Sequence, residues 1–115
     1  MTCTEAQQTI AENVLKYTNM LCEALIHNFK SRNNGNDGGY KFYPESGRKY
    51  HKIVMETGSG SRSVHAFVDK KTGEVYKSAT WKSPVKGVRY DLRLIKDREY
   101  LLQNADWSGG YLYAK

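Results

Sequence analysis

The segment VHAFVDKKTGEVYKSA, residues 64–79, contains two short runs of alternating side chains on either side of a turn signal. Alternation with a period of two is typical of β-strands, because successive side chains point to opposite faces of a sheet. Asp69 can accept hydrogen bonds from the backbone amides of the turn that follows it, and Gly73 supplies the positive φ of a bulged hairpin turn. The segment therefore predicts an antiparallel hairpin with strands over 64–68 and 74–79.

An apolar stripe runs through the first third of the chain and predicts one long α-helix. Its members recur at three- and four-residue steps, and the width of the stripe is typical of a helix that packs on a core. Two capping boxes fit its start: Thr2 with Glu5, and Thr4 with Gln7. The asparagines and glycines of SRNNGNDGG, residues 31–39, are typical of a helix end. The stripe consists of Ile10, Val14, Tyr17, Leu21, Leu25 and Phe29, widened by Ala11, Leu15, Cys22 and Ile26.

Two further strands are predicted before the hairpin, over 40–43 and 50–57, with Pro44 and Gly47 marking the turn between them. After the hairpin, the sequence KDREYLLQN, residues 96–104, predicts a second and shorter helix.

Two segments fit more than one structure. Residues 85–95 alternate apolar and charged side chains as a strand does, but their apolar spacing also fits a helix. The tail ADWSGGYLYAK, residues 105–115, has a Gly-Gly break followed by an apolar end. That end could pair at a sheet edge or pack beneath the helix.

Together these elements predict a single α+β domain over residues 1–115. The long N-terminal helix is expected to pack on one face of an antiparallel sheet of three to five strands, with a second, shorter helix near the C-terminus. Val64, Ala66 and Val68 would share the face that contacts the helix. The composition, 39% apolar and 26% charged, is ordinary for a folded domain and argues against disorder.

The chain carries a formal charge of +6, and its basic residues are concentrated after the helix. Residues 77–98 alone hold seven basic and two acidic residues, which favours a polyanionic partner. Cations interleaved with aromatic rings are typical of proteins that bind single-stranded nucleic acid, where the rings stack on bases. We therefore predict nucleic-acid binding. The expected phosphate contacts are Lys77, Lys82, Lys86, Arg89 and Arg93, with Arg62 beside the preceding glycine loop, and the expected stacking residue is Trp81 or Tyr90.

A structural interpretation of this basic segment stays open. The residues of one strand point alternately to opposite faces, so the charges could be split over a solvated surface. Trp81 has the same parity as Val75 and Ala79 and could equally be a core residue.

The alternative function is a protein–protein interaction module that binds a host factor or is part of a virion. Such a module would present a contiguous apolar or tyrosine-rich surface, or would self-associate through an unpaired edge strand. The candidate residues for that surface are Tyr40, Phe42, Tyr43 and Tyr50.

Catalytic and metal-binding patterns are weak in this sequence. His51 and His65 lie on successive predicted strands and could approach each other, which makes an enzyme built on them a third and least favoured hypothesis. A zinc site needs three or four ligands, and neither Cys3 nor Cys22 has ligand spacing to the histidines. No motif of a nucleophilic serine or cysteine is present. We therefore expect a protein without catalytic residues, metal or cofactor.

The sequence features that bear on cellular location predict a soluble, cytoplasmic protein. The N-terminus has no signal-peptide pattern, and no apolar run approaches the roughly 18 residues of a membrane span. Cys3 and Cys22 would lie far apart on one helix, so they are expected to remain free thiols, as suits a reducing compartment.

The run KTGEVYKSATWKSPVKGVRY, residues 71–90, and the run DWSGGYLY, residues 106–113, resemble a family of small proteins encoded by tailed bacteriophages, notably phages of marine cyanobacteria. The likeness covers about the last half of the chain. The family has no assigned function, so the resemblance implies an origin and no site. It implies action in the cytoplasm of an infected bacterial cell.

Overall fold

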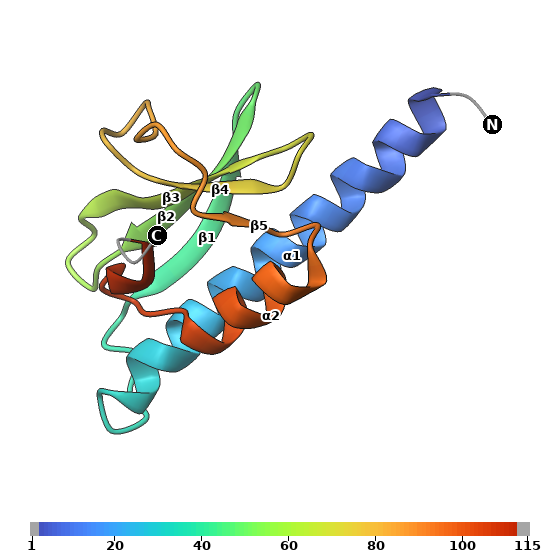
Figure 1. Cartoon of the computed structure of the whole chain (residues 1–115). Coiled ribbons are helices and arrows are strands. Elements are labelled where there is room, and N and C mark those ends of the chain that lie inside the picture. Colours follow the sequence, from blue (N-terminus) through green and yellow to red (C-terminus); the bar gives the residue numbers. More distant parts are fainter. Residues whose placement is uncertain (1–2, 113–115) are drawn as a thin grey trace.

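The computed structural model describes the backbone of residues 3–112 and the side chains of residues 7–112. A five-stranded antiparallel sheet, with its strands in sequence order, packs against two helices that lie side by side (Figure 1). This is the α+β arrangement that the sequence predicts. The elements are α1 (Cys3–Ser31), β1 (Lys41–Ser46), β2 (Tyr50–Glu56), β3 (Arg62–Asp69), β4 (Glu74–Lys77), β5 (Tyr90–Asp91), α2 (Ile95–Asn104) and the 3-10 turn η1 (Gly110–Leu112).

Helix α1 crosses the sheet, and its N-terminal end extends past the sheet edge (Figure 1). Its stripe supplies the core as predicted, since Val14, Leu21 and Leu25 are fully buried. The helix ends where the sequence predicts, because Asn34 and Gly35 adopt positive φ just beyond it. The capping boxes expected at its start lie outside the described side chains.

The widened side of the stripe is only partly buried. Cys22 is buried and Ile26 is half-buried, but Ala11 is exposed and Leu15 is 38% exposed. The prediction is therefore wrong for Ala11 and Leu15, because at this level of α1 only the side that carries Ile10 and Val14 contacts the core.

The turn that joins β3 to β4 has the predicted chemistry. Asp69 Oδ1 accepts hydrogen bonds from the amides of Lys71 (2.8 Å) and Thr72 (3.1 Å). Gly73 has φ +76° and donates its amide to the Asp69 carbonyl at 2.9 Å. Strand β4 ends two residues earlier than predicted, and a single bridge between Ser78 and Pro84 continues the pairing beyond it.

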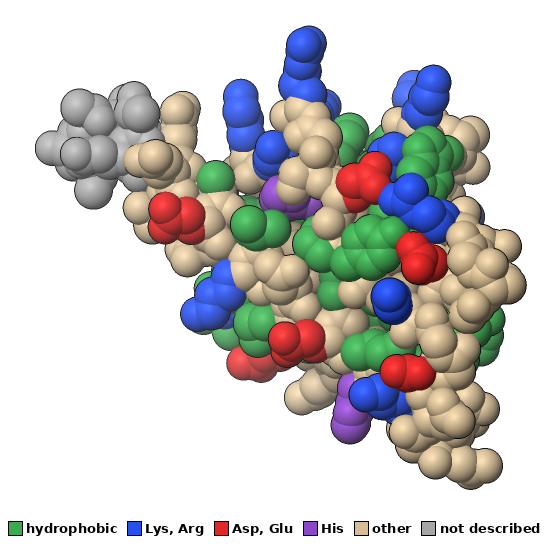
Figure 2. Space-filling model, turned by 180° about the vertical axis from the view of Figure 1, so that it is seen from behind, with side chains coloured by type: hydrophobic (Ala, Val, Ile, Leu, Met, Phe, Trp, Pro, Cys, Tyr) green, Lys and Arg blue, Asp and Glu red, His purple; other side chains and the backbone are tan. Residues whose placement is uncertain are grey.

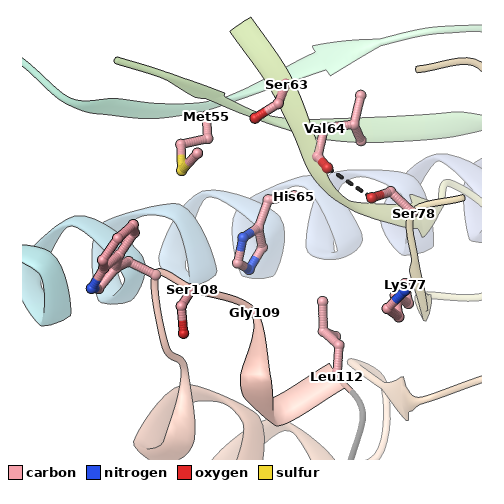
Figure 3. Close-up of a pocket in the computed structure, with 10 residues that line it drawn as sticks. Met55, Ser63, Val64, His65, Lys77, Ser78, Ser108, Gly109 and Leu112 are labelled. Carbon is pink, nitrogen blue, oxygen red and sulfur yellow. Dashed lines mark hydrogen bonds between the residues drawn. The ribbon is translucent and has the colours of Figure 1, made fainter. Parts of the chain in front are cut away.

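A bulge in β3 changes the alternation expected for this strand. Ile53 pairs with Ala66 and Val54 pairs with Val64, which leaves His65 as an extra residue. His65 points into a cavity on the helix side of the sheet, whereas the Val64 side chain points away from it (Figure 3). The prediction that Val64 shares a face with Ala66 and Val68 is therefore wrong.

One other boundary differs from the prediction, and the structure decides the two segments that fitted more than one structure. Pro44 lies within β1, where a strand tolerates proline because β1 is at the sheet edge, so the turn begins only after Ser46. Within 85–95, only Tyr90–Asp91 form a strand, and α2 begins at Ile95. In the tail, Tyr111 and Leu112 of η1 are buried in the core and add no strand to the sheet.

Candidate site on the outer face of the sheet

The sheet has two faces with different coverings. The inner face packs on α1, α2 and η1 around a core that includes Ile53, Val68 and Tyr90. Neither described helix covers the opposite face, which we call the outer face. Its central row runs directly across four strands, because Glu45 pairs with Lys52, Lys52 with Phe67, and Phe67 with Tyr76.

Aromatic rings are the main feature of the outer face. Phe67 is buried there, and Tyr50 packs edge-on against it with ring centroids 5.5 Å apart. Tyr76 makes the same kind of contact with Tyr50 at 6.0 Å. Tyr50 and Tyr76 are both half-buried, so part of each ring remains accessible. Such rings can contact a base, because every base has a flat aromatic surface.

Trp81 lies over this face, on a loop that the chain forms between β4 and β5. The Thr80 hydroxyl accepts the amides of Lys82 and Ser83, both at 3.2 Å, so the tip of the loop is held in a defined turn. Lys52 Nζ lies 4.5 Å from the Trp81 ring centroid, and Arg62 Cζ lies 5.2 Å from it. Cations at these distances attract the face of an indole ring. Trp81 remains 38% exposed, and the core position considered for it is therefore wrong.

Arg62 is part of an exposed polar network on the same face. Its guanidinium forms an ion pair with Glu45, and its Nε donates to the Tyr43 hydroxyl at 3.0 Å. The Tyr43 hydroxyl in turn donates to Glu56 at 3.1 Å. The hydrogen bonds to Glu45 and Tyr43 raise the pKa of Arg62. Glu45 therefore balances the charge of Arg62, and it also lies directly opposite Lys52 on the neighbouring strand.

The predicted site residues are divided between separate parts of the molecule. Lys82 and Lys86 are exposed on the loop that carries Trp81, and Arg62 contacts the Trp81 ring. Lys77 lines the cavity on the helix side of the sheet. Arg93 is exposed beyond β5, with its side-chain carbons beside Gly73. The charges of the basic segment therefore do not converge on one patch.

Two of the predicted contacts have structural roles instead. Tyr90 is 1% exposed, and its hydroxyl donates to the Tyr111 carbonyl at 2.8 Å, so it cannot stack on a base. The expectation for Tyr90 is wrong because its parity on β5 directs the ring into the core. Arg89 Nε donates to the Leu112 carbonyl at 2.8 Å and Nη1 donates to the Gly87 carbonyl at 3.1 Å. Arg89 thus ties η1 to the segment before β5.

Lys52 and Tyr76 were not among the predicted site residues, and Tyr43 and Tyr50 were predicted for a different surface. Tyr50 and Lys52 alternate with the buried His51 and Ile53, so the period-two pattern of β2 was the available signal. The tyrosine-rich surface of the alternative hypothesis is split. Tyr43 and Tyr50 belong to the outer face, whereas Tyr40 stacks on Phe29 and Phe42 contacts the His65 ring.

A second candidate site is the cavity of about 380 Å³ on the helix side of the sheet (Figure 3). His65 points into it, and its Nε2 lies 2.7 Å from the Tyr111 hydroxyl. Burial lowers the pKa of His65 to about 4, although Asp106 acts in the opposite direction. Neutral His65 is therefore the dominant form at neutral pH.

The two strand histidines do not form a joint site. His51 pairs with Val68, three residues from His65, so about 10 Å of strand separates the two positions. His51 Nδ1 instead lies 2.7 Å from the Ser46 hydroxyl, and burial followed by the charge of Lys70 lowers its pKa. Among the described residues, no group of three potential ligands could hold a metal ion.

Comparison with known proteins identifies a family but no activity. A family model described as a family of unknown function, DUF7717, matches residues 1–114, and the chain belongs to this family. No curated protein and no solved structure matches the chain. Neither of the helices in residues 3–112 is long and apolar enough to cross a membrane.

Proposed function

We propose that the protein binds single-stranded nucleic acid on the outer face of the sheet, with Trp81 as the principal stacking residue. The observation that carries the proposal is the placement of Trp81, exposed on a face without a covering helix and flanked by Lys52 and Arg62. A stacking ring beside cations is the combination that binds single strands with little sequence preference.

The phosphate contacts of this proposal come from two segments. Lys52 extends from β2 to the indole ring, and Lys82 and Lys86 are exposed on the loop that holds Trp81. Tyr50 and Tyr76 would extend the stacking surface across the sheet, since they contact each other on the same face. Arg62 contributes less, because Glu45 already neutralises it.

The test is a titration of the protein with an oligothymidylate at several salt concentrations, followed by fluorescence anisotropy of the labelled oligonucleotide. Removal of one stacking ring costs about 1–3 kcal/mol, so Trp81→Ala is expected to weaken binding about 5- to 150-fold. If three phosphates are neutralised, the logarithm of affinity should fall with the logarithm of salt with a slope of about −2.

Trp107→Phe is the matched control, because Trp107 packs against Phe29 and Tyr40 on the helix side of the molecule. Binding in this variant should equal that of the original chain. A Trp81→Ala variant that binds equally well would exclude this face. Absence of oligonucleotide binding at low salt would favour the protein–protein alternative.

The bacteriophage origin and the cytoplasm of an infected host belong to the same proposal. They rest on the resemblance of residues 71–90 and 106–113, and a genome that places the gene among phage genes would support them.

A further inference from the structure

A second concave surface lies between the N-terminal end of α1 and the turns β1–β2 and β3–β4. Its volume is about 770 Å³, within the range of small-molecule sites. We call it the helix–turn cleft. Helix α1 contributes Ile10 and Ala11, and the turns contribute Arg48, Lys49, Lys70 and Lys71. None of these residues is a proposed phosphate or stacking contact for nucleic acid, but Lys49 Nζ lies 5.3 Å from the ring centroid of Tyr50 on the outer face.

Backbone contacts hold the two turns together and thereby concentrate the four cations. The Lys70 amide donates to the Lys49 carbonyl at 3.0 Å, and Lys70 Nζ donates to the Gly47 carbonyl at 3.0 Å. Two pairs of basic residues that are distant in the sequence therefore meet at one end of the sheet. Figure 2 shows Lys and Arg side chains projecting at this upper end of the molecule, next to the N-terminal part of α1.

The positive charge of the cleft has little internal compensation. Asp69 is the acidic residue in the cleft lining, but it is 7% exposed and its Oδ1 accepts the amides of Lys71 and Thr72. Within the described part of the chain, the ion pair present is that of Arg62 with Glu45, and none of the four cleft cations takes part in it. An anion that enters the cleft would meet Arg48, Lys70 and Lys71 without displacing an acid, while the Lys49 ammonium group lies over the Tyr50 ring.

The wall of the cleft formed by α1 is suited to contact a flat ring of a ligand. Ile10 is half-buried and Ala11 is exposed, so the helix presents small apolar side chains to the cleft. Gln7 and Gln8 precede them and add amide groups that can donate and accept hydrogen bonds. An apolar wall with hydrogen-bonding groups at its end opposes the cationic turns across the same space.

From this combination we propose that the helix–turn cleft binds a small ligand carrying at least two phosphate groups on a ring system, as in a nucleoside diphosphate. The phosphates would contact Arg48, Lys70 and Lys71, and the ring would lie on Ile10 and Ala11. A guanidinium and ammonium groups together suit a diphosphate, because charge-assisted hydrogen bonds to phosphate are short and strong.

The experiment is calorimetric titration at low salt with ADP, adenosine and pyrophosphate as separate probes. ADP should bind, pyrophosphate should bind at least about tenfold more weakly because it lacks the ring, and adenosine should not bind at about 1 mM. The variant Arg48→Gln with Lys71→Gln removes two exposed cations and should weaken ADP binding at least about tenfold. Ala11→Glu places a carboxylate on the apolar wall and should abolish it.

The double variant Lys82→Gln with Lys86→Gln is the matched control, because it removes the same charge from a different loop. It should change ADP binding less than about twofold. Equal losses of ADP affinity in both double variants would mean that net charge alone attracts ADP. Pyrophosphate binding as tight as that of ADP would show that the adenosine rings contribute nothing to binding. Absence of ADP binding, or displacement of ADP by an oligothymidylate, would also overturn the assignment. Trp81→Ala should leave ADP binding unchanged, so the two proposals can fail separately.

Discussion

Tyr90 and Trp81 lie nine positions apart in one basic segment, yet they end on opposite faces of the sheet. On the inner face, Tyr90 is closed in by the core, and its hydroxyl satisfies the Tyr111 carbonyl. On the outer face, Trp81 is held by a hydrogen-bonded loop and flanked by two cations. The inner aromatic residue therefore contributes to stability, whereas the outer one remains accessible at the surface.

The same contrast applies to the basic residues. The segment 77–98 carries many charges along the chain, but its side chains go to different places. Lys77 lines the cavity on the helix side, Arg89 binds η1, and Lys82 is exposed to solvent. The cations of the helix–turn cleft come from two short turns and form the more concentrated patch. Charge density in the sequence is thus a poor guide to charge density on the surface, because strand pairing decides which residues meet.

The largest expected effect concerns the core beneath the inner face. Leu25 is fully buried between α1 and the sheet, so Leu25→Ala should lower the free energy of unfolding by about 2–5 kcal/mol. Leu15 is 38% exposed on the same helix, and Leu15→Ala should change it by less than about 0.5 kcal/mol. Urea denaturation of the two variants measures the difference. Similar losses would show that the side of α1 that carries Leu15 is also packed.

The next largest effect is a loss of folding stability at acidic pH, caused by His65 on the inner face of the sheet. Its pKa is lowered from 6.5 to about 4 in the folded protein, so the unfolded chain binds a proton more readily. Stability is therefore expected to fall as the pH decreases from about 6.5 to about 4. Because His65 as a residue is half-buried and not fully buried, we expect a loss of about 2 kcal/mol rather than the full value of the shift.

Denaturation midpoints measured across this pH range test the assignment. His65→Gln removes the titrating group, so its stability should depend less on pH even if it is lower at neutral pH. His27→Gln is the matched control on the exposed surface of α1 and should retain the acid destabilisation. An unchanged pH dependence in His65→Gln would assign the effect to other groups.

The sequence predicted the fold correctly at the elements that one local pattern of residues determines. The helical stripe predicted the side of α1 that faces the core. Asp69 and Gly73 predicted the β3–β4 turn, including the hydrogen bonds that Asp69 accepts from backbone amides. The bulge at His65 had no such signal, because the extra residue becomes apparent only when β3 pairs with β2. A single inserted position then reverses the expected side of Val64.

The candidate site was predictable only in part for the same reason. Trp81 was identified by its neighbouring lysines, but its contacts with Lys52 and Arg62 depend on the sheet register and on the path of the loop. The helix–turn cleft was not predicted at all. Its cations come from two turns that meet through the bond of the Lys70 amide to the Lys49 carbonyl, a contact between different hairpins.

A smaller effect is expected for the hydroxyl of the inner aromatic residue. Tyr90→Phe removes the bond to the Tyr111 carbonyl and leaves that buried acceptor without this donor, at a cost of about 1 kcal/mol. Thermal denaturation measures the loss. Oligonucleotide binding should remain unchanged, because the ring is inaccessible. Weaker binding by a fully folded Tyr90→Phe would contradict the division of roles between the two faces.

The smallest expected effect concerns the acid that faces Arg62 on the outer face. Glu45→Gln removes an exposed ion pair, so the free energy of unfolding should change by less than about 1 kcal/mol. The freed guanidinium gains the ability to neutralise a phosphate. The salt dependence of oligothymidylate binding should therefore steepen by about 0.7 in its logarithmic slope.

Glu12→Gln separates this local effect from a change in total charge, because Glu12 is exposed on α1, away from the outer face. Both variants raise the net charge of the chain by one. Only Glu45→Gln alters a cation that contacts Trp81, so only it should steepen the slope. An equal steepening in both variants would mean that the oligonucleotide responds to overall charge, and the distinction between the inner and outer faces would then have no bearing on binding.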